Sequence, residues 1–314
     1  MERRVSGIVT HEPEGGVLYL VGTPIGHRGD LSPRARQVLA GVACIGCEDT
    51  RHSAPLLQAF DIRTPLLSFH RHNSRERLPG LLQRLAAGEA LALISDAGLP
   101  GISDPGEDLV AAVRAAGGRV VCVPGPCAAL TALVCSGLPC ERFCFEGFLP
   151  SRGRERSERL QILAQEPRTS VLYEAPHRLR QLLTELHDAC GPERPLQVAR
   201  ELTKRHEQLV GPDVATALAH FNDHSPQGEF TLVLGGAPPP PPPAWDAAAL
   251  RGQLQELLDA GSPPADACRL LARRTGQPRR ALYALLHADS ENSATEGSDT
   301  DPQDGTLEPS PPGA

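Results

Sequence analysis

The stretch that decides the fold is Val17-Leu18-Tyr19-Leu20-Val21-Gly22, an apolar run that stops at a glycine and continues as Thr23-Pro24-Ile25-Gly26. Short apolar runs that end at glycine and proline, with an amphipathic helical pattern beyond, indicate strand–loop–helix units. A second unit has the same form, because the apolar residues 90–94 run into a loop of glycine, proline and aspartate at 95–106. In an open α/β sheet such loops form the ligand-binding crevice. We therefore expect an α/β fold that binds its ligand on these two loops.

Strand and helix patterns alternate along most of the chain. Strands are predicted at residues 17–21, 42–45, 65–69, 90–94 and 119–123, with helices at 34–40, 76–87 and 109–116. This alternation is typical of a parallel sheet that is covered on both faces. After Gly137-Leu138-Pro139 the pattern restarts, with strands at 143–146, 170–173, 196–199 and 230–234 and helices at 155–164 and 178–190. The sequence thus predicts two α/β domains, with a boundary near Glu141 or within residues 147–153.

A third region follows the second domain. Six consecutive prolines at 238–243 predict a semi-rigid spacer. Helical patterns at 250–260, 265–275 and 279–287, with six arginines, indicate a small helix-turn-helix-like module that either contacts nucleic acid or serves as a packing element. The polar residues from Asp289 onward are expected to be disordered. The predicted division is an arm at 1–16, α/β domains at 17–140 and 141–237, a linker at 238–246, the helical module at 247–288 and an acidic tail at 289–314.

Charge and composition narrow the class of protein. The net charge of −7 comes from the tail, since residues 289–314 hold seven acidic and no basic side chains and the remainder is balanced at 31 of each. A neutral body with local arginine clusters permits an RNA partner without requiring one. No secretory signal pattern is visible, and the apolar stretch 120–138 is broken by Pro124, Gly125 and Pro126, so no membrane span is expected and a cytoplasmic location is predicted.

The nine cysteines are expected to be reduced thiols that pack as small apolar side chains, as on the segments of Cys122, Cys135 and Cys144. Cys44 and Cys47 form a C-x-x-C pair without a second pair at zinc-ribbon spacing. We therefore favour core packing for this pair and predict no metal site.

The loops also limit the chemistry. No G-x-G-x-x-G follows the first strand and no Walker A motif is present, so dinucleotide, ordinary class I methyltransferase and P-loop sites are disfavoured. In residues 95–106, glycine lets the backbone approach a ligand closely and proline fixes the shape of the loop. Asp96 and Asp104 can pair with an amino group or with hydroxyls of a ligand. Alternatively they cap turns or helices, which for Asp104 would be a helix start at Pro105.

Seven motifs occur in order along the chain. They are Gly22-Thr23-Pro24-Ile25-Gly26, Glu48-Asp49-Thr50-Arg51-His52, residues 95–106, Val123-Pro124-Gly125-Pro126-Cys127-Ala128, Tyr173-Glu174-Ala175-Pro176-His177-Arg178, Ala199-Arg200-Glu201-Leu202-Thr203-Lys204 and Gly228-Glu229-Phe230. Together they resemble the bacterial ribosomal RNA small-subunit methyltransferase I family, cytidine 2'-O-methyltransferases of the tetrapyrrole-methylase superfamily. Departures such as His27 in place of the usual Asn and Leu99 in place of Thr remove no carboxylate and no loop glycine.

The resemblance implies a two-domain tetrapyrrole-methylase-like fold, that of the class III methyltransferases, with a small helical C-terminal extension. It implies S-adenosylmethionine in the cleft between the domains, a cytidine in the decoding centre of 16S rRNA as the acceptor, and a homodimer. Carried over motif by motif, the cofactor-binding residues are Pro24, Asp96, Ala97, Gly98, Ile102, Pro126, Cys127, Ala128, Glu174, Ala175, Glu201, Phe230 and Thr231.

Methyl transfer to a ribose oxygen depends mainly on positioning, with help in removing the hydroxyl proton. Lys204 is the only lysine against thirty arginines, so a compact or deprotonatable ammonium is one explanation for it and chance retention is the other. Glu48 or Asp49 is a base or a substrate anchor, unless it forms an ion pair with Arg51. The catalytic candidates are Lys204, Asp96 and Glu48.

For RNA, the most suggestive stretch is residues 68–77, which combines cationic and hydrogen-bonding side chains. The alternative is that Ser74 caps a helix whose arginines are solvated. A second basic run at 152–159 is expected to be an exposed helix start, with or without an RNA contact. The candidate substrate-binding residues are Arg51, His52, His70, Arg71, His72, Arg75, His177 and Arg178.

Two other functions stay open at this point. One is methylation of a tetrapyrrole, although the first loop reads Thr23-Pro24-Ile25-Gly26 and not the Gly-Pro-Gly-Asp type of those enzymes. The other is a non-enzymatic regulator that binds nucleic acid through the C-terminal arginine-rich helices.

Overall fold

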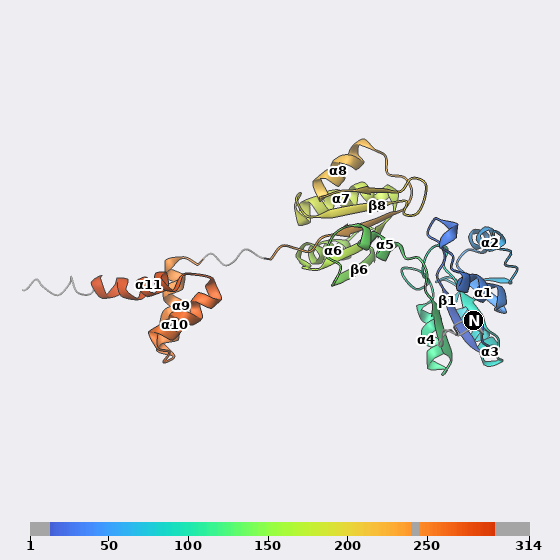
Figure 1. The fold of residues 1–314 in the computed structure, drawn as a ribbon, viewed down its shortest axis with the longest axis horizontal. Coiled ribbons are helices and arrows are strands. Elements are labelled where there is room, and N and C mark those ends of the chain that lie inside the picture. The colour runs from blue at the N-terminus through green and yellow to red at the C-terminus, as the bar shows by residue number, and fades with distance from the viewer. Residues whose placement is uncertain (1–12, 240–244, 293–314) are drawn as a thin grey trace, which may run out of the picture. The chain divides into compact units, whose positions relative to one another are not determined.

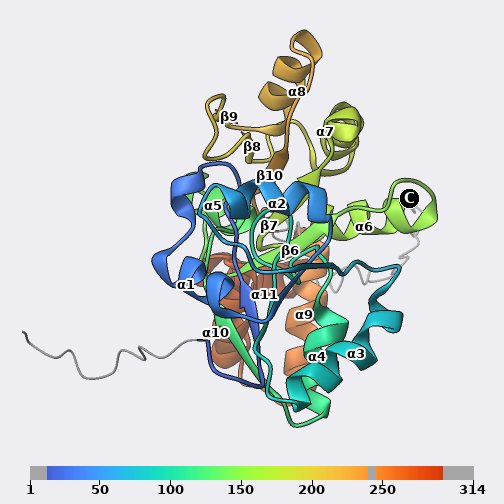
Figure 2. The same cartoon turned by 90° about the vertical axis from the view of Figure 1, so that its right-hand side faces the viewer.

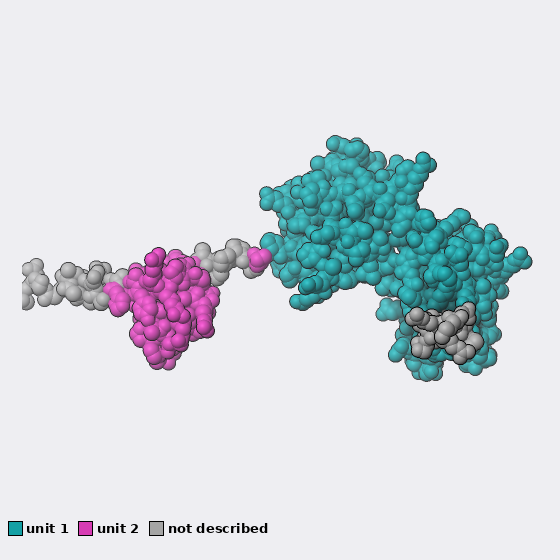
Figure 3. All heavy atoms as spheres, viewed as in Figure 1, with its two compact units in different colours: residues 1–238 teal, residues 239–314 magenta. Residues whose placement is uncertain are grey.

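The computed structural model describes residues 13–239 and 245–292. The chain forms two compact units, residues 1–238 and residues 239–314 (Figure 3). The expectations for most of the N-terminal arm, most of the proline spacer and the acidic tail beyond residue 292 lie outside the described residues.

The first sheet of unit 1 is wholly parallel, as predicted. Its strands are β1 (Val17–Val21), β2 (Cys44–Cys47), β3 (Leu66–Ser68), β4 (Leu91–Leu93) and β5 (Arg119–Val123), in the order β3-β2-β4-β1-β5. Figure 1 labels β1 of this sheet and the helices around it. Tyr19 of β1 packs in a core with α1 (Pro33–Gly41) and α2 (Thr50–Gln58). Its neighbour Leu18 points to the other face, against α3 (Ser74–Ala86) and α4 (Glu107–Ala115), which lie side by side (Figure 2). Both faces of the sheet are therefore covered.

The second sheet is mixed, which the sequence did not indicate. It contains β6 (Phe143–Phe148), β7 (Thr169–Glu174), β8 (Leu196–Arg200), β9 (Gln208–Val210) and β10 (Phe230–Leu234) in the order β6-β7-β10-β8-β9. Only β6 and β7 pair in parallel. One face packs against α6 (Arg154–Gln165), α7 (Pro176–Cys190) and α8 (Val214–Asp223), and the other packs against α5 (Ala128–Cys135). Ile25, from the loop after β1, joins the α5 core and thereby links the two sheets.

Several elements were missed or shifted for local reasons. Pro55 lies inside α2 and obscured its helical pattern. α5 belongs to a stretch so apolar that no helical periodicity stands out, and β9 has only three residues. β2 begins two residues later than predicted because Val42 ends α1, donating its backbone N–H to the carbonyl of Val38.

Unit 2 confirms the three C-terminal helical patterns, but the last helix continues to Asn292, so the expectation of disorder from Asp289 onward is wrong for residues 289–292. α9 (Ala247–Asp259), α10 (Pro264–Thr275) and α11 (Arg279–Asn292) enclose a small core. The buried members of this core are Leu250, Leu254, Ala267, Cys268, Leu271 and Leu282.

All nine cysteines are free, in agreement with the prediction of reduced thiols. Cys44 and Cys47 are buried in β2, so the core-packing interpretation of that pair is confirmed. The expectation of packing as small apolar side chains is wrong for Cys122 and Cys135, because both are exposed. Cys122 lies on the edge strand β5. Across the part of the chain that is described, no helix combines the length and the apolar character that a membrane span needs.

Candidate functional site

Two adjoining cavities lie at the carboxyl ends of the first-sheet strands. The larger has a volume of about 490 Å³ and the smaller of about 310 Å³. Ile25, Asp96, Ala97 and Glu229 line both cavities, so the two spaces share a wall. Ten of the thirteen predicted cofactor-binding residues line the larger cavity: Asp96, Ala97, Gly98, Ile102, Cys127, Ala128, Glu174, Ala175, Phe230 and Thr231. Pro24 lines the smaller cavity, and Pro126 and Glu201 line neither.

Close backbone contacts hold the loops that form this wall. A Cβ atom on Gly22 would lie 2.7 Å from the Cα of Gly125, so only glycine allows these two loops to touch. Thr23 and Gly98 exchange backbone hydrogen bonds of 2.8 and 3.1 Å, and the Thr23 hydroxyl donates to the Ser95 carbonyl. Gly98 adopts a φ of +90°, a conformation that favours glycine. The loops after β1 and β4 therefore form one rigid rim.

The larger cavity is acidic. Glu48, Asp96 and Asp104 all line it. Burial raises the pKa of Asp104 to about 6; a hydrogen bond with Ser95 opposes the rise, and the nearby Glu48 and Asp96 charges add to it. The expectation that Asp104 caps a helix is wrong, because α4 begins after Gly106, whose φ is +144°. A half-buried carboxylate beside two others is suited to a cationic ligand.

The carboxylate that pairs with Arg51 is Asp49, not Glu48. Asp49 caps α2 by accepting the Arg51 backbone N–H at 2.8 Å and forms an ion pair of 2.8 Å with the guanidinium. The Arg51 hydrogen bonds lower the pKa of Asp49 to about 2. The predicted ion pair with Arg51 is therefore formed by Asp49, and Glu48 remains in the lining of the larger cavity.

Lys204 lies in the smaller cavity between two carboxylates. Its Nζ donates to Glu201 Oε1 and Glu229 Oε2, each at 2.9 Å. Burial acts to lower the pKa of Lys204, but the hydrogen bonds that it donates to Glu229 and Glu201 outweigh this effect and the pKa is raised. The side chain is thus an ammonium at neutral pH.

The loop that carries Lys204 is held in an unusual conformation. Glu201 and Thr203 both have positive φ, 51° and 65°. The Thr203 hydroxyl accepts the His27 backbone N–H at 3.0 Å, and a Cβ on Gly26 would lie 2.5 Å from the Lys204 side chain. Non-glycine residues at positive φ cost free energy and persist where the surroundings hold them. Here the loop after β1 supplies that support.

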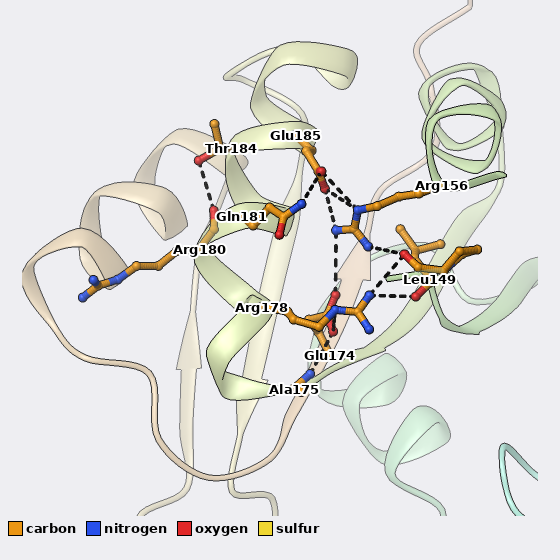
Figure 4. Close-up of polar contacts among 10 residues, drawn as sticks. Leu149, Arg156, Glu174, Ala175, Arg178, Arg180, Gln181, Thr184 and Glu185 are labelled. Carbon is orange, nitrogen blue, oxygen red and sulfur yellow. Dashed lines mark hydrogen bonds and ion pairs between the residues drawn. The ribbon is translucent and has the colours of Figure 1, made fainter. Parts of the chain in front are cut away.

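Glu174 borders the larger cavity, but its carboxylate is fully buried among arginines (Figure 4). Arg178 Nε lies 3.2 Å and Arg156 Nη2 lies 4.0 Å from its oxygens. Arg156 Nε also donates to Glu185 at 2.9 Å, and Arg178 donates to the Leu149 carbonyl at 2.7 Å. These contacts anchor the end of β7 from behind the cavity, and they occupy the Arg178 side chain that was predicted to bind substrate.

The expectation that residues 152–159 form an exposed basic helix start is wrong for Arg156, whose side chain is 4% exposed. Arg154 and Arg159 are ion-paired with Glu158 and Glu146. The sequence could not show this, because the partners of Arg156 lie far along the chain.

The residues at 70–75 lie near the larger cavity without lining it. Arg71 donates to the Ser103 carbonyl at 3.3 Å, and Ser103 does line that cavity. The expectation that Ser74 caps a helix is wrong, since the N-cap of α3 is Asn73. The Asn73 side chain instead accepts the His70 N–H and donates to the Ser68 carbonyl, which shapes the loop.

Among the predicted substrate residues, only His52 lines a cavity, the smaller one; Arg51, His70, Arg71, His72, Arg75, His177 and Arg178 lie outside both. Sequence reasoning missed Arg28, which also lines the smaller cavity, and Phe148 and Tyr173 in the larger one. The Phe148 and Tyr173 rings lie 5.6 Å apart, and the Tyr173 hydroxyl accepts the Ala129 N–H. Only 4% of the residues in this chain are aromatic, so two aromatic residues near the ends of neighbouring strands could have been singled out as site candidates from the sequence.

Comparison with known proteins confirms the predicted fold. Residues 17–218 match the family model for Tetrapyrrole (Corrin/Porphyrin) Methylases, and residues 244–290 match the model for the RsmI C-terminal HTH domain. The crystal structure of uroporphyrin-III C-methyltransferase from Thermus thermophilus complexed with S-adenyl homocysteine superposes with a TM-score of 0.50 and 19% identity, covering 70% of this chain and 96% of that one.

Sequence relatives are closer. A Synechocystis protein named Ribosomal RNA small subunit methyltransferase I is 51% identical over 277 residues, which cover 87% of this chain and 99% of the relative. A Xylella fastidiosa protein of the same name is 47% identical over 272 residues, covering 85% of this chain and 98% of the relative.

Proposed function

The chain belongs to the ribosomal RNA small subunit methyltransferase I family, and from that membership we propose that it transfers a methyl group from S-adenosylmethionine to a cytidine 2'-hydroxyl in 16S rRNA. The observation that carries the proposal is the pair of adjoining cavities. The larger one is acidic, and the smaller one holds the only lysine of the chain. A donor site next to an acceptor site is the arrangement that a group transfer needs.

The larger cavity fits the donor. Its volume lies within the range of about 300–1,000 Å³ that is usual for small-molecule sites. S-adenosylmethionine carries a sulfonium and an α-ammonium, and Asp96, Glu48 and Asp104 provide the complementary negative charge. Pro126 and Glu201 support the walls: the Pro126 carbonyl packs near Gly98, and Glu201 holds Lys204. When bound, the donor supplies an activated methyl group on sulfur.

The smaller cavity takes the acceptor nucleotide. In this proposal the Asp96 carboxylate orients the 2'-hydroxyl and accepts its proton, and its position in the lining of both cavities supports that role. Glu48 supports the same negative region from the donor side. Lys204, as an ammonium, donates to an oxygen of the ribose or its phosphate and fixes the acceptor. His52, together with the exposed Arg51, His72, Arg75 and His177, contacts the flanking RNA.

We also propose a homodimer and a cytoplasmic location. Leu130 and Val134 on α5, and Phe143 and Phe145 on the edge strand β6, are large apolar side chains that are exposed in the single chain. Exposed apolar side chains grouped on neighbouring elements mark interaction surfaces. The ribosomal substrate supports the cytoplasmic location.

The test uses tritiated S-adenosylmethionine with small subunits or 16S rRNA from cells that lack the endogenous enzyme. Nuclease digestion and mass mapping should place the label on a cytidine ribose. Asp96→Ala and Lys204→Ala should abolish labelling, whereas Arg205→Ala, an exposed neighbour outside both cavities, should not. Donor binding without RNA labelling would refute the ribosomal assignment and favour a tetrapyrrole acceptor. A label on a base would refute the ribose assignment.

A further inference from the structure

Unit 2 separates its charges along the chain. Between residues 245 and 287, every aspartate and glutamate precedes residue 267, whereas residues 267–287 contain five arginines and no aspartate or glutamate. Arg269 is ion-paired with Asp266. The other four, Arg273, Arg274, Arg279 and Arg280, are exposed, and none of them forms an ion pair with a carboxylate of residues 13–239 or 245–287. These four residues are the arginine surface.

The fold of unit 2 brings the arginine surface together. Arg273 and Arg274 are in the last turn of α10, and Arg279 and Arg280 begin α11. The connection is short because Gly276 takes a left-handed φ of 72° and ends α10 at Thr275. Leu271 and Leu282 are fully buried in the shared core, so the arginines are left on the outer side of both helices.

The arrangement is unfavourable for the isolated module. Four like charges are crowded within eight residues, and Arg279 and Arg280 occupy the end of α11 where the helix dipole disfavours cations. A polyanion would relieve both effects. Arginine in particular presents a planar fork of donors that matches phosphate oxygens.

We propose that the arginine surface binds the phosphate backbone of the RNA substrate, as a contact separate from the two cavities. The proposal rests on the proposed function, which supplies the RNA. Phosphate contacts add affinity and orientation without reading sequence. Each phosphate contact to a single strand makes the slope of log affinity against log salt concentration steeper by about 0.7. At about 0.15 M salt, loss of one such contact should therefore weaken binding about fourfold.

The test compares full-length proteins. The variant Arg273→Gln/Arg274→Gln/Arg279→Gln/Arg280→Gln is measured beside the wild type for binding to 16S rRNA at several salt concentrations. We expect the salt slope to fall by up to about 3 and the affinity at about 0.15 M salt to weaken by roughly 10- to 200-fold. Methylation at saturating RNA should keep its kcat, because the arginines do not line the cavities.

Single substitutions provide a matched control. Arg251 is exposed on α9 of the same unit, so Arg251→Gln removes an equal charge away from the surface. Arg279→Gln should weaken RNA binding about fourfold and Arg251→Gln should not. The proposal would be overturned if the wild type and the variant with all four substitutions had equal salt slopes and the same helical content.

Two further outcomes separate the possible failures. If the variant loses binding to assembled subunits but not to free rRNA, the surface contacts a ribosomal protein and the RNA proposal is wrong. If the wild type neither binds nor methylates rRNA, the proposed function fails and this inference fails with it.

Discussion

Replacing Asp104 with asparagine should stabilise the protein above pH 6 and weaken its binding of S-adenosylmethionine. Burial beside Glu48 and Asp96 raises the pKa of Asp104 from 3.8 to about 6. Because the pKa is higher in the folded chain than in the unfolded one, the folded state binds more protons between these two values. The free energy of unfolding therefore falls as pH rises from about 4 to 6, and the penalty is complete at neutral pH. An asparagine carries no charge to bury.

The size of the effect follows from the shift. About two pKa units, at about 1.4 kcal/mol each, give about 3 kcal/mol when the charge is fully shielded from water. Since Asp104 is only half-buried, solvent screening reduces this to about 1.5 kcal/mol. For a unit of this size, that corresponds to about 3–6 °C in Tm. Loss of one charged partner for the donor should weaken binding by about 1.5 kcal/mol, roughly tenfold.

The assay is thermal unfolding at pH 5 and pH 8, with and without donor, combined with calorimetric binding. The Asp104→Asn variant should match the wild type more closely at pH 5, have the higher Tm at pH 8, and gain less from added donor. Asp108→Asn, an exposed carboxylate in the first turn of α4, serves as the control and should show neither effect. A variant less stable than the wild type at pH 8, or one that binds donor equally well, would show that Asp104 is not a strained donor-binding carboxylate.

Three other predictions follow from single contacts. Glu201→Ala should reduce methylation more than Glu229→Ala, because the Glu201 carboxylate also accepts the Glu229 backbone N–H at 3.0 Å and the truncation removes that acceptor; equal losses in kcat would contradict this ranking. Arg156→Met should destabilise the protein by about 3 kcal/mol in denaturant unfolding, because Glu185 loses its ion-pair partner and the buried Glu174 keeps only Arg178, and adding Glu185→Leu should restore part of the loss. Gly22→Ala should cost about 1–3 kcal/mol because its Cβ would meet Gly125, whereas Gly80→Ala in α3 has open space and should be neutral or stabilising in the same measurement.

The sequence predicted the elements whose signals are local. β1 and β4 are buried on both faces, so they appear in the sequence as apolar runs bounded by glycine, proline or aspartate. The loops after them contain the glycines that backbone contact requires, and the cavities lie there. The mixed pairing of the second sheet could not be predicted in this way, because strand direction depends on which distant strands become neighbours.

The side-chain assignments failed where charge is balanced by distant partners. Arg156, Glu174 and Arg178 look like surface or site residues in the sequence, yet they neutralise one another and Glu185 behind the cavity. Ion pairs within a few residues are also ambiguous, since Glu48 and Asp49 were equal candidates for Arg51. The start of α2 decides between them, because the residue that caps the helix, Asp49, is held beside Arg51.

The setting of Lys204 bears on how the acceptor loses its proton. A lysine that served as the base would need a lowered pKa, but two carboxylates at 2.9 Å raise the pKa of Lys204. The two partners differ, because the Glu201 side chain is 18% exposed and the Glu229 side chain is 71% exposed. An incoming phosphate or ribose oxygen can therefore take the place of Glu229 while Glu201 keeps the ammonium aligned. This agrees with our proposal that Asp96, which borders both cavities, accepts the proton. A compact ammonium with freely rotating donors fits this exchange between a fixed and an exposed carboxylate better than a planar guanidinium, whose donors form a rigid fork.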